Sequence, residues 1–237
     1  MSQTQEIKWP RITIEAAVIV VSILLAFSIQ AWWELRTQQA EARAYVEAVR
    51  TELIANRETV IEDLKTLRGW VEESELYLNT VVAPNASPSY DEVREMVWKT
   101  GPNSTIPLAR SAFDDLVSSG GFQSIDLAEL RRALADYARS LENDAAEQQD
   151  VRDFFDQFIY PYHVSRGSFT EFDWEEYNEL PDSSVSFPLD VDAFAGNRTY
   201  ANLLISRILE YGNLRDAHRD LLEKIDKALS LIDSAFQ

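Results

Sequence analysis

The sequence predicts an all-α protein: a single N-terminal transmembrane helix continues into an antiparallel helical bundle, which carries one long aromatic and acidic loop region. Two observations support the helices. An uncharged apolar run lies near the N-terminus, and apolar residues recur every three or four positions in three proline-free windows, 11–83, 108–160 and 189–237. The loop region is indicated by proline, aromatic and acidic residues between the last two windows. The predicted divisions are a short flank (1–11), a transmembrane helix (12–33), a first bundle part (34–160), the loop region (161–196) and a C-terminal helix (197–237).

The apolar run, Ile12–Trp33, has the length of a membrane span. No charged residue occurs over residues 16–29. As a helix the run extends about 33 Å, slightly more than a hydrocarbon core of roughly 30 Å. Trp9 precedes the run, and Trp32 and Trp33 end it, as expected for aromatic rings at the two headgroup regions. We therefore expect a membrane anchor with these three tryptophans at its ends.

Two other interpretations of this run are weaker. A buried helix of a soluble domain could carry the same apolar residues, but few such helices have tryptophan at both ends. A cleaved signal peptide would use small residues such as Ala26 and Ser28 at its cleavage site. Against cleavage, the apolar run continues past both residues and a helical pattern follows directly.

Two polar residues of the anchor, Glu15 and Gln30, allow a second role for the helix. In the simpler interpretation Glu15 lies at headgroup depth, one turn from Arg11. In the alternative, Glu15 or Gln30 makes a polar contact with a neighbouring membrane helix.

The flanking charges favour one orientation. Lys8, Arg11 and the α-amino group lie in the short N-terminal flank, which the positive-inside rule weighs more heavily than a long domain. We expect a single-pass protein of the bacterial inner membrane, with its N-terminus in the cytoplasm and its C-terminal domain in the periplasm. Residues 1–36 carry equal numbers of acidic and basic side chains, so the net charge of −18 belongs to the extramembrane part.

Apolar stripes and breakers predict the helices of the bundle in order. The first helix continues from the anchor, a short helix covers 90–100, and another covers 107–118 and ends at Gly120. Asp126 is a good N-cap for the next helix, with Glu129 completing a capping box, and the last helix starts at Arg198. The apolar stripe of the first helix consists of Val46, Val49, Leu53, Asn56, Val60, Leu64, Leu67, Val71, Ser74 and Leu78.

The loop region combines aromatic side chains with many carboxylates. The aromatic residues offer area to bury, so we expect an ordered loop with short helical or strand-like pieces, lying against the bundle. Asp190-Val191-Asp192 lacks the third ligand and the central glycine of an EF-hand loop, which favours a solvated acidic surface over a Ca²⁺ site and leaves Ca²⁺ open. The predicted partner surface consists of Tyr162, Phe169, Phe172, Trp174 and Tyr177.

Composition and motifs argue against most catalytic chemistry. The 22 basic and 40 acidic side chains argue against nucleic-acid binding, and the absence of cysteine removes thiolate catalysis and cysteine-bound metals. No P-loop, dinucleotide-binding or nucleophile-elbow motif occurs. Neither His163 nor His218 belongs to a Glu-x-x-His motif, and a structural role is expected for each. We therefore predict no catalytic residue, no cofactor and no metal site.

The anchor resembles the start of a bacterial single-pass membrane protein family of unknown function, whose members open with a pattern like GEIxLVVxGILLALxIxxWxExR before a helical domain. Ile14 and Ser22 replace two glycines of that pattern. Residues 111–120 (SAFDDLVSSG), with Leu130, Arg131 and Tyr137 after them, are similar to a second family motif, an Asp-Leu-x-Ser-x-Gly turn and the helix after it. The resemblance implies an anchored helical domain and no established activity. The residues that match the opening pattern are Glu15, Ile23, Leu24, Leu25, Ala26, Ile29, Trp32 or Trp33, Glu34 and Arg36.

These features predict a non-enzymatic accessory or scaffolding subunit of a respiratory, photosynthetic or envelope membrane complex, docking through its helical domain. The expected partners are the lipid bilayer and other subunits, with homo-oligomers left open. The alternative is a periplasmic helical-bundle ligand sensor. It would act through a separate partner, because the 11 residues before the anchor are too few for a signalling domain. A membrane-bound enzyme using carboxylates and water is a third, weaker hypothesis, since 40 acidic residues single out no pair.

Overall fold

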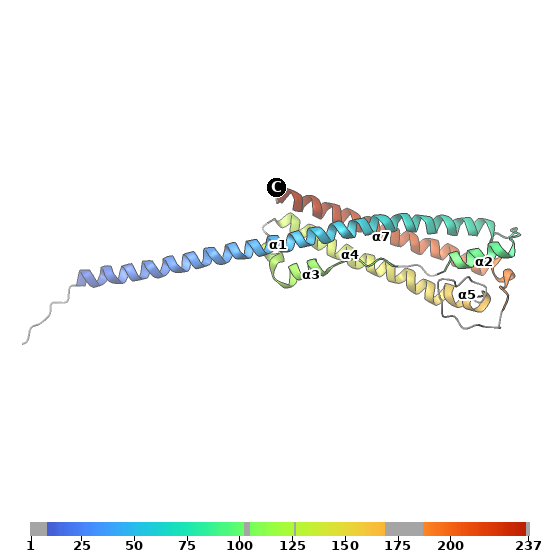
Figure 1. Ribbon diagram of the computed structural model, residues 1–237, viewed down its shortest axis with the longest axis horizontal. Helices are drawn as coiled ribbons and strands as arrows, with labels where there is room; N and C mark the ends of the chain where they lie inside the picture. The colour runs from blue at the N-terminus through green and yellow to red at the C-terminus, as the bar shows by residue number, and fades with distance from the viewer. Residues whose placement is uncertain (1–8, 102–104, 126, 169–186, 236–237) are drawn as a thin grey trace, which may run out of the picture. The chain divides into compact units, whose positions relative to one another are not determined.

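The computed structural model describes residues 9–101, 105–125, 127–168 and 187–235; in the first helix, side chains are described from Ile19 onward, except at positions 35, 38 and 39. Every regular element in these ranges is helical, which confirms the prediction of an all-α protein (Figure 1). The elements are α1 (Trp9–Thr80), α2 (Tyr90–Lys99), α3 (Ser111–Ser118), η1 (Gly121–Ser124), α4 (Ala128–Phe154), η2 (Phe155–Ile159), α5 (Tyr160–Arg166), α6 (Val191–Phe194) and α7 (Arg198–Ala235).

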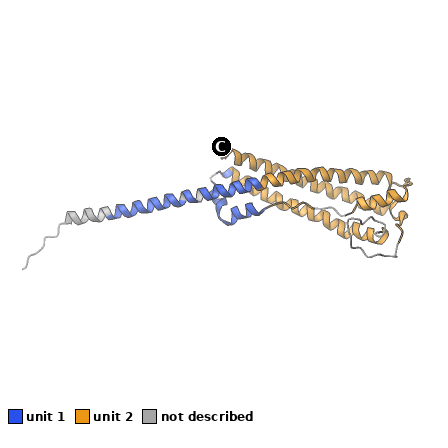
Figure 2. Cartoon of the chain, in the orientation of Figure 1, with its two compact units in different colours: residues 1–51, 110–128 blue, residues 52–109, 129–237 orange. Residues whose placement is uncertain are grey.

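The chain divides into two compact units, each described below by itself (Figure 2). Unit 1 comprises residues 1–51 and 110–128, and unit 2 comprises residues 52–109 and 129–237. Within the described ranges, no helix contains a stretch both long enough and apolar enough to span a bilayer.

In unit 1, a glycine turn joins α3 to η1. Gly120 has a φ of 78°, in the left-handed region that glycine enters without a Cβ clash, and it ends α3 as predicted. The rings of Phe113 and Phe122 then meet edge to face across the turn, with their centroids 6.3 Å apart. The helix itself begins at Ser111 rather than at the predicted Pro107. The predicted N-cap Asp126 lies outside the described residues.

In unit 2, residues 52–80 of α1 run parallel to α4. Asn56 hydrogen-bonds the Tyr137 hydroxyl, and Leu67, three turns further along α1, packs in one cluster with Val151, further along α4. Both helices therefore run in the same direction. This corrects the prediction of an antiparallel bundle for the α1–α4 pair.

Residues 105–110, which precede α3, return along the bundle without forming a helix. This return allows α4 to run parallel to α1. Ile106 N–H donates to the Gln148 side chain at 3.0 Å, and Asn56 binds both backbone groups of Ala109, at 2.7 and 2.8 Å. These side-chain bonds satisfy backbone groups that a helix would otherwise pair. The chain is thereby brought back to the level at which α4 can start beside α1.

The helix α7 runs antiparallel to both, as predicted. Arg57 of α1 pairs with Asp226 of α7 at 2.6 Å, whereas Leu67, later in α1, packs with Tyr211, earlier in α7. The buried face of α1 follows the predicted stripe. Its members are buried or half-buried throughout: Val46, Val49, Leu53, Asn56, Val60, Leu67 and Ser74 are buried, and Leu64, Val71 and Leu78 are half-buried.

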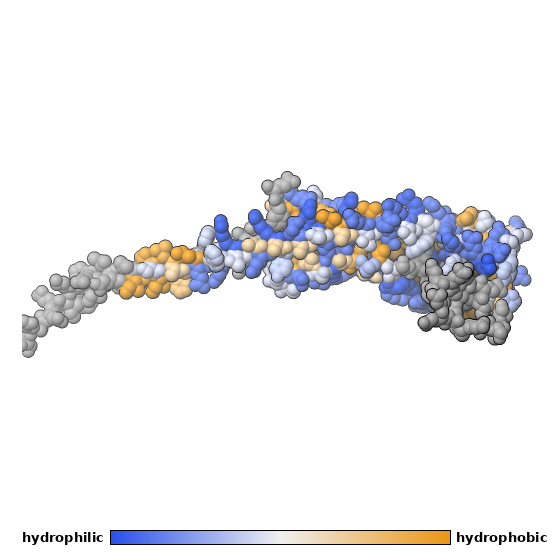
Figure 3. All heavy atoms as spheres, in the orientation of Figure 1, coloured by the Kyte–Doolittle hydropathy of each residue, from blue (hydrophilic) through white to orange (hydrophobic). Residues whose placement is uncertain are grey.

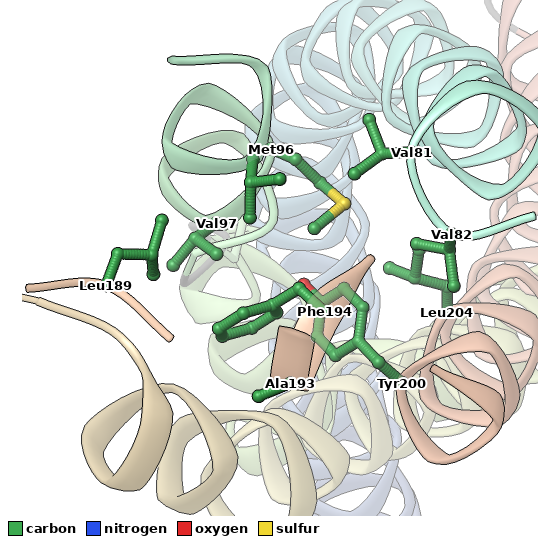
Figure 4. Close-up of a cluster of buried hydrophobic side chains, with 10 residues drawn as sticks. Val81, Val82, Met96, Val97, Leu189, Ala193, Phe194, Tyr200 and Leu204 are labelled. Atoms are coloured by element: carbon green, nitrogen blue, oxygen red, sulfur yellow. The ribbon is translucent and has the colours of Figure 1, made fainter. Parts of the chain in front are cut away.

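An apolar cluster closes one end of the bundle and joins the end of α1 with α2, α6 and the start of α7 (Figure 4). Phe194 and Tyr200 form its centre, with ring planes at 80° and centroids 4.8 Å apart, a favoured edge-to-face geometry. The cluster consists of Val81, Val82, Val93, Met96, Val97, Leu189, Ala193, Phe194, Tyr200 and Leu204.

The helix of α4 continues past Pro161 through the π-helical turn η2. Proline has no N–H, and in an α-helix its ring clashes with the carbonyl four residues earlier. The wider turn of η2 lies directly before Pro161, and Tyr160 N–H bonds the Phe155 carbonyl across it. The region 161–196, predicted as a loop with short pieces, thus contains α5 residues and α6, and its residues 169–186 lie outside the described ranges.

Candidate functional site

The described part of the predicted anchor presents apolar side chains on every side of the helix. Residues 19–33 of α1 carry no charge, and successive residues of an α-helix point about 100° apart. Figure 3 shows the resulting hydrophobic band. Ten large side chains in it are between 49% and 66% exposed: Ile19, Val20, Val21, Ile23, Leu24, Leu25, Phe27, Ile29, Trp32 and Trp33.

Polar side chains of this band hydrogen-bond within the helix itself. Ser28 Oγ donates to the Leu24 carbonyl at 2.8 Å, and Gln30 Nε2 donates to Glu34 Oε1 at 2.9 Å. Gln30, which with Glu15 was the alternative candidate for a contact to a neighbouring membrane helix, thus makes one hydrogen bond inside α1. The side chains of Trp9 and Glu15 lie outside those described.

A buried polar network links the three long helices of unit 2. His218 of α7 lies between two carboxylates: its Nδ1 bonds Asp144 of α4, and its Nε2 lies 2.8 Å from Asp63 of α1. The side chains of His218 and Asp144 are fully buried, and that of Asp63 is 10% exposed. Gln148 Nε2 donates to the second Asp144 oxygen at 2.8 Å and connects the network to Ile106.

The network holds His218 as a cation. Burial alone would lower the His218 pKa, but the hydrogen bonds and charges of Asp144 and Asp63 outweigh burial and raise the pKa to about 9. Both ring nitrogens donate at neutral pH, and both are occupied by carboxylates. Because the ring has no exposed face, its geometry is that of an internal clamp between helices.

The other histidine lies in a second buried network, at the end of the bundle shown in Figure 4. Thr100 Oγ1 donates to the Met96 carbonyl at 2.7 Å, so it accepts from the Tyr200 hydroxyl at 2.8 Å. Tyr200 in turn accepts from His163 Nε2 at 3.0 Å. Burial, and then the charge of Arg207, lowers the His163 pKa to about 3, so this imidazole is neutral.

Arg207 anchors that network to the end of α2. Its guanidinium donates to the carbonyls of Thr100 and Gly101 and, at 2.6 Å, to the hydroxyl of Tyr211. It also lies 5.2 Å from the centroid of the Tyr211 ring. The side chain is 3% exposed, so these contacts hold the two carbonyls that directly follow α2 from inside the bundle.

The predicted partner surface is only partly within the described residues. Tyr162 packs against Phe194 and Tyr200, with centroids 5.5 and 5.4 Å away, and its hydroxyl donates to the Ala193 carbonyl. It is therefore engaged inside the chain. The other four members, Phe169, Phe172, Trp174 and Tyr177, lie outside the described residues.

Exposed apolar residues on α7 and η2 form a surface that the sequence analysis missed. Ile205 and Leu209 lie one turn apart on α7 and are 44% and 63% exposed, and Phe158 of the adjoining η2 is 53% exposed. The C-terminal helix has an apolar seam that includes Leu204 and Ile208, and each of the two exposed α7 residues follows one of them by one position. Apolar residues beside a seam that already accounts for the core are the signal that could have revealed them. We call Phe158, Ile205 and Leu209 the exposed apolar residues of α7 and η2.

No protein-family model matches the chain, and neither the curated proteins nor the solved structures contain a significant match to it. In the described part of the chain, no group of three His, Asp or Glu residues is placed to hold a metal ion.

Proposed function

We propose that this protein is a non-enzymatic accessory subunit of a membrane complex, anchored in the bacterial inner membrane by residues 12–33 and docking through its helical domain. The observation that supports it most is the all-round exposure of the apolar residues 19–33 in a helix that continues into the bundle. A groove on a partner protein would cover one face of such a helix, whereas lipid covers all of them. The sequence extends the uncharged run back to Ala16, and the predicted span reaches the length of a hydrocarbon core by including Ile12 to Glu15.

The polar residues of the band agree with a lipid environment. Ser28 donates to a backbone carbonyl of α1, and Gln30 donates one hydrogen bond to Glu34 on the same helix. The Trp32 ring lies 5.0 Å from the Arg36 guanidinium, a pairing suited to the headgroup region.

The non-enzymatic assignment is supported by how the bundle uses its polar groups. His163, His218, Asp63 and Asp144, the natural candidates for acid–base chemistry, are buried and bonded to one another or to Tyr200. Their hydrogen bonds connect different helices and fix how these helices align along one another. By contrast, the exposed apolar residues of α7 and η2 are about half exposed or more, as interface cores are before assembly.

Purification in mild detergent tests this function. The full-length chain should bring down membrane subunits at a fixed ratio, measured by quantitative mass spectrometry across a gel-filtration peak. Leu209→Asp should release them, because it places a charge in an apolar interface, while the chain stays in the membrane fraction. Asn213→Asp, an exposed change one turn further along α7, serves as the matched control. A clean monomer in every mild detergent would contradict the proposal.

A further inference from the structure

A groove of about 210 Å³ lies between α1 and α7 in unit 2, and three arginines line it. Arg68 comes from α1, and Arg215 and Arg219 come from α7. Glu72 is the single acidic residue among the lining side chains, so the groove carries a local excess of positive charge in a chain of net charge −18. Arginines gathered at one hollow of so acidic a protein indicate an anion site.

The guanidinium groups are only loosely engaged by the protein. Arg215 and Arg219 share one carboxylate, Asp216, at 3.3 and 3.4 Å. Arg68 has no carboxylate within salt-bridge distance in the described part of the chain. An incoming anion therefore displaces at most two weak, solvent-exposed contacts, both to Asp216.

The floor of the groove is apolar and fixed. Leu67 and Tyr211 are buried, Leu64 and Val71 are half-buried, and these four side chains complete the lining. The Tyr211 ring packs on Trp70 at 5.7 Å between centroids, and its hydroxyl is held by a hydrogen bond from Arg207. The hollow is therefore preformed, which reduces the entropic cost of binding.

We propose that this groove binds a small carboxylate with an apolar body, an aryl or acyl carboxylate. Guanidinium groups bind carboxylates through paired N–H donors, and the apolar floor favours a hydrocarbon group behind that head. A cavity of about 150 Å³ accommodates benzene, so a hollow of this volume suits a fused ring or a short acyl chain. The ligand could be a soluble aromatic acid or an acyl acid that leaves the membrane.

Calorimetric titration of the full-length chain in phosphatidylcholine nanodiscs tests the proposal, with empty nanodiscs as blank. The probes are 1-naphthoate, decanoate and the uncharged 1-naphthamide. Both carboxylates should bind saturably, and naphthamide should bind at least about tenfold more weakly, because it lacks the charge that the arginines recognise. Tighter decanoate binding indicates an acyl acid from the membrane, and tighter naphthoate binding indicates a soluble aryl acid.

Variants locate the site. Arg68→Gln should weaken naphthoate binding about tenfold, and adding Arg219→Gln should weaken it further. Glu72→Gln should strengthen it roughly threefold, because the opposing charge is removed. Arg139→Gln is the matched control, since this α4 arginine is 76% exposed and lies outside the groove.

The gain expected for Glu72→Gln keeps the test independent of folding defects, which would only weaken binding. Val71→Trp fills the groove without changing its charge and should abolish naphthoate binding. Naphthoate binding that is absent, or equal in the wild type and Arg68→Gln, overturns the proposal. The result is separate from docking, because partners can be lost by Leu209→Asp while naphthoate still binds.

Discussion

The helix α1 contains two segments with opposite relations to their surroundings. Over residues 19–33 its side chains are apolar and exposed on all sides, and its polar groups bond within the helix. Over residues 52–80 only one stripe is buried, and that stripe includes polar residues such as Asn56 and Asp63, which bond to other helices. Among the described residues, the first segment leaves its apolar side chains exposed, whereas the second buries one stripe against other helices.

The comparison shows what specifies each segment. Residues 19–33 require only a uniform apolar environment, so many apolar sequences would serve equally well. The bundle segment depends on particular partners, because a buried polar group that loses its hydrogen bond costs about 1–3 kcal/mol. Mutations should therefore act through length and charge in the first segment and through single atoms in the second.

The largest expected effect separates the two segments. Deleting residues 12–33 should move the chain from the membrane to the soluble fraction, since no other described segment is apolar on all sides. A separate fragment of residues 40–237 should likewise be soluble and stay largely helical by circular dichroism. A fragment that sediments without detergent, or that gives a strand spectrum, would break the comparison.

In the bundle, the largest single-residue effect is expected at His218. His218→Ala leaves the buried Asp63 and Asp144 carboxylates without their shared cation, which should cost about 3–5 kcal/mol of unfolding free energy in urea titrations of the 40–237 fragment. Replacing all three residues by Leu should recover most of that loss, because no charge is then buried. Equal losses in the single and triple variants would show that the network is not an electrostatic clamp.

The pH dependence of stability should show the same clamp. The His218 pKa is raised to about 9 from an ordinary 6.5, so its stabilisation is fully present below about pH 6.5 and is lost as pH rises through 9. The loss in unfolding free energy should be roughly 3 kcal/mol at most. His163 acts in the opposite direction on the acid side, since its lowered pKa favours the unfolded chain below about pH 6.5. A free energy that is flat from pH 6.5 to 9 would contradict the assignment.

A smaller effect is expected at Asn56, which holds the returning segment. Asn56→Leu leaves the Ala109 N–H, the Ala109 carbonyl and the Tyr137 hydroxyl without this partner and should cost about 2 kcal/mol. The control Thr66→Ala, at an exposed position of the same helix, should change the unfolding free energy by less than about 0.5 kcal/mol. Similar losses of unfolding free energy in both variants would show that the Asn56 contacts do not hold the returning segment.

Local patterns predicted the helices but not their partners. The α1 stripe was predictable because apolar spacing along one helix is a property of neighbouring residues. The sequence indicated a structural role for His218, but its partners Asp63 and Asp144 lie 155 and 74 residues away in sequence, and only the assembled bundle brings them together. The parallel α1–α4 pair likewise depends on Asn56 and Gln148 binding a segment with no periodicity of its own.

Single-cysteine labelling tests the central claim, the membrane anchor, most directly, because the natural chain has no cysteine. In intact spheroplasts, a membrane-impermeant maleimide should label Thr66→Cys, which is exposed on the bundle, and should leave Leu24→Cys unlabelled until detergent is added. This result places residue 24 in lipid and the bundle in the periplasm. Labelling of Leu24→Cys at the rate of Thr66→Cys before detergent would contradict the anchor.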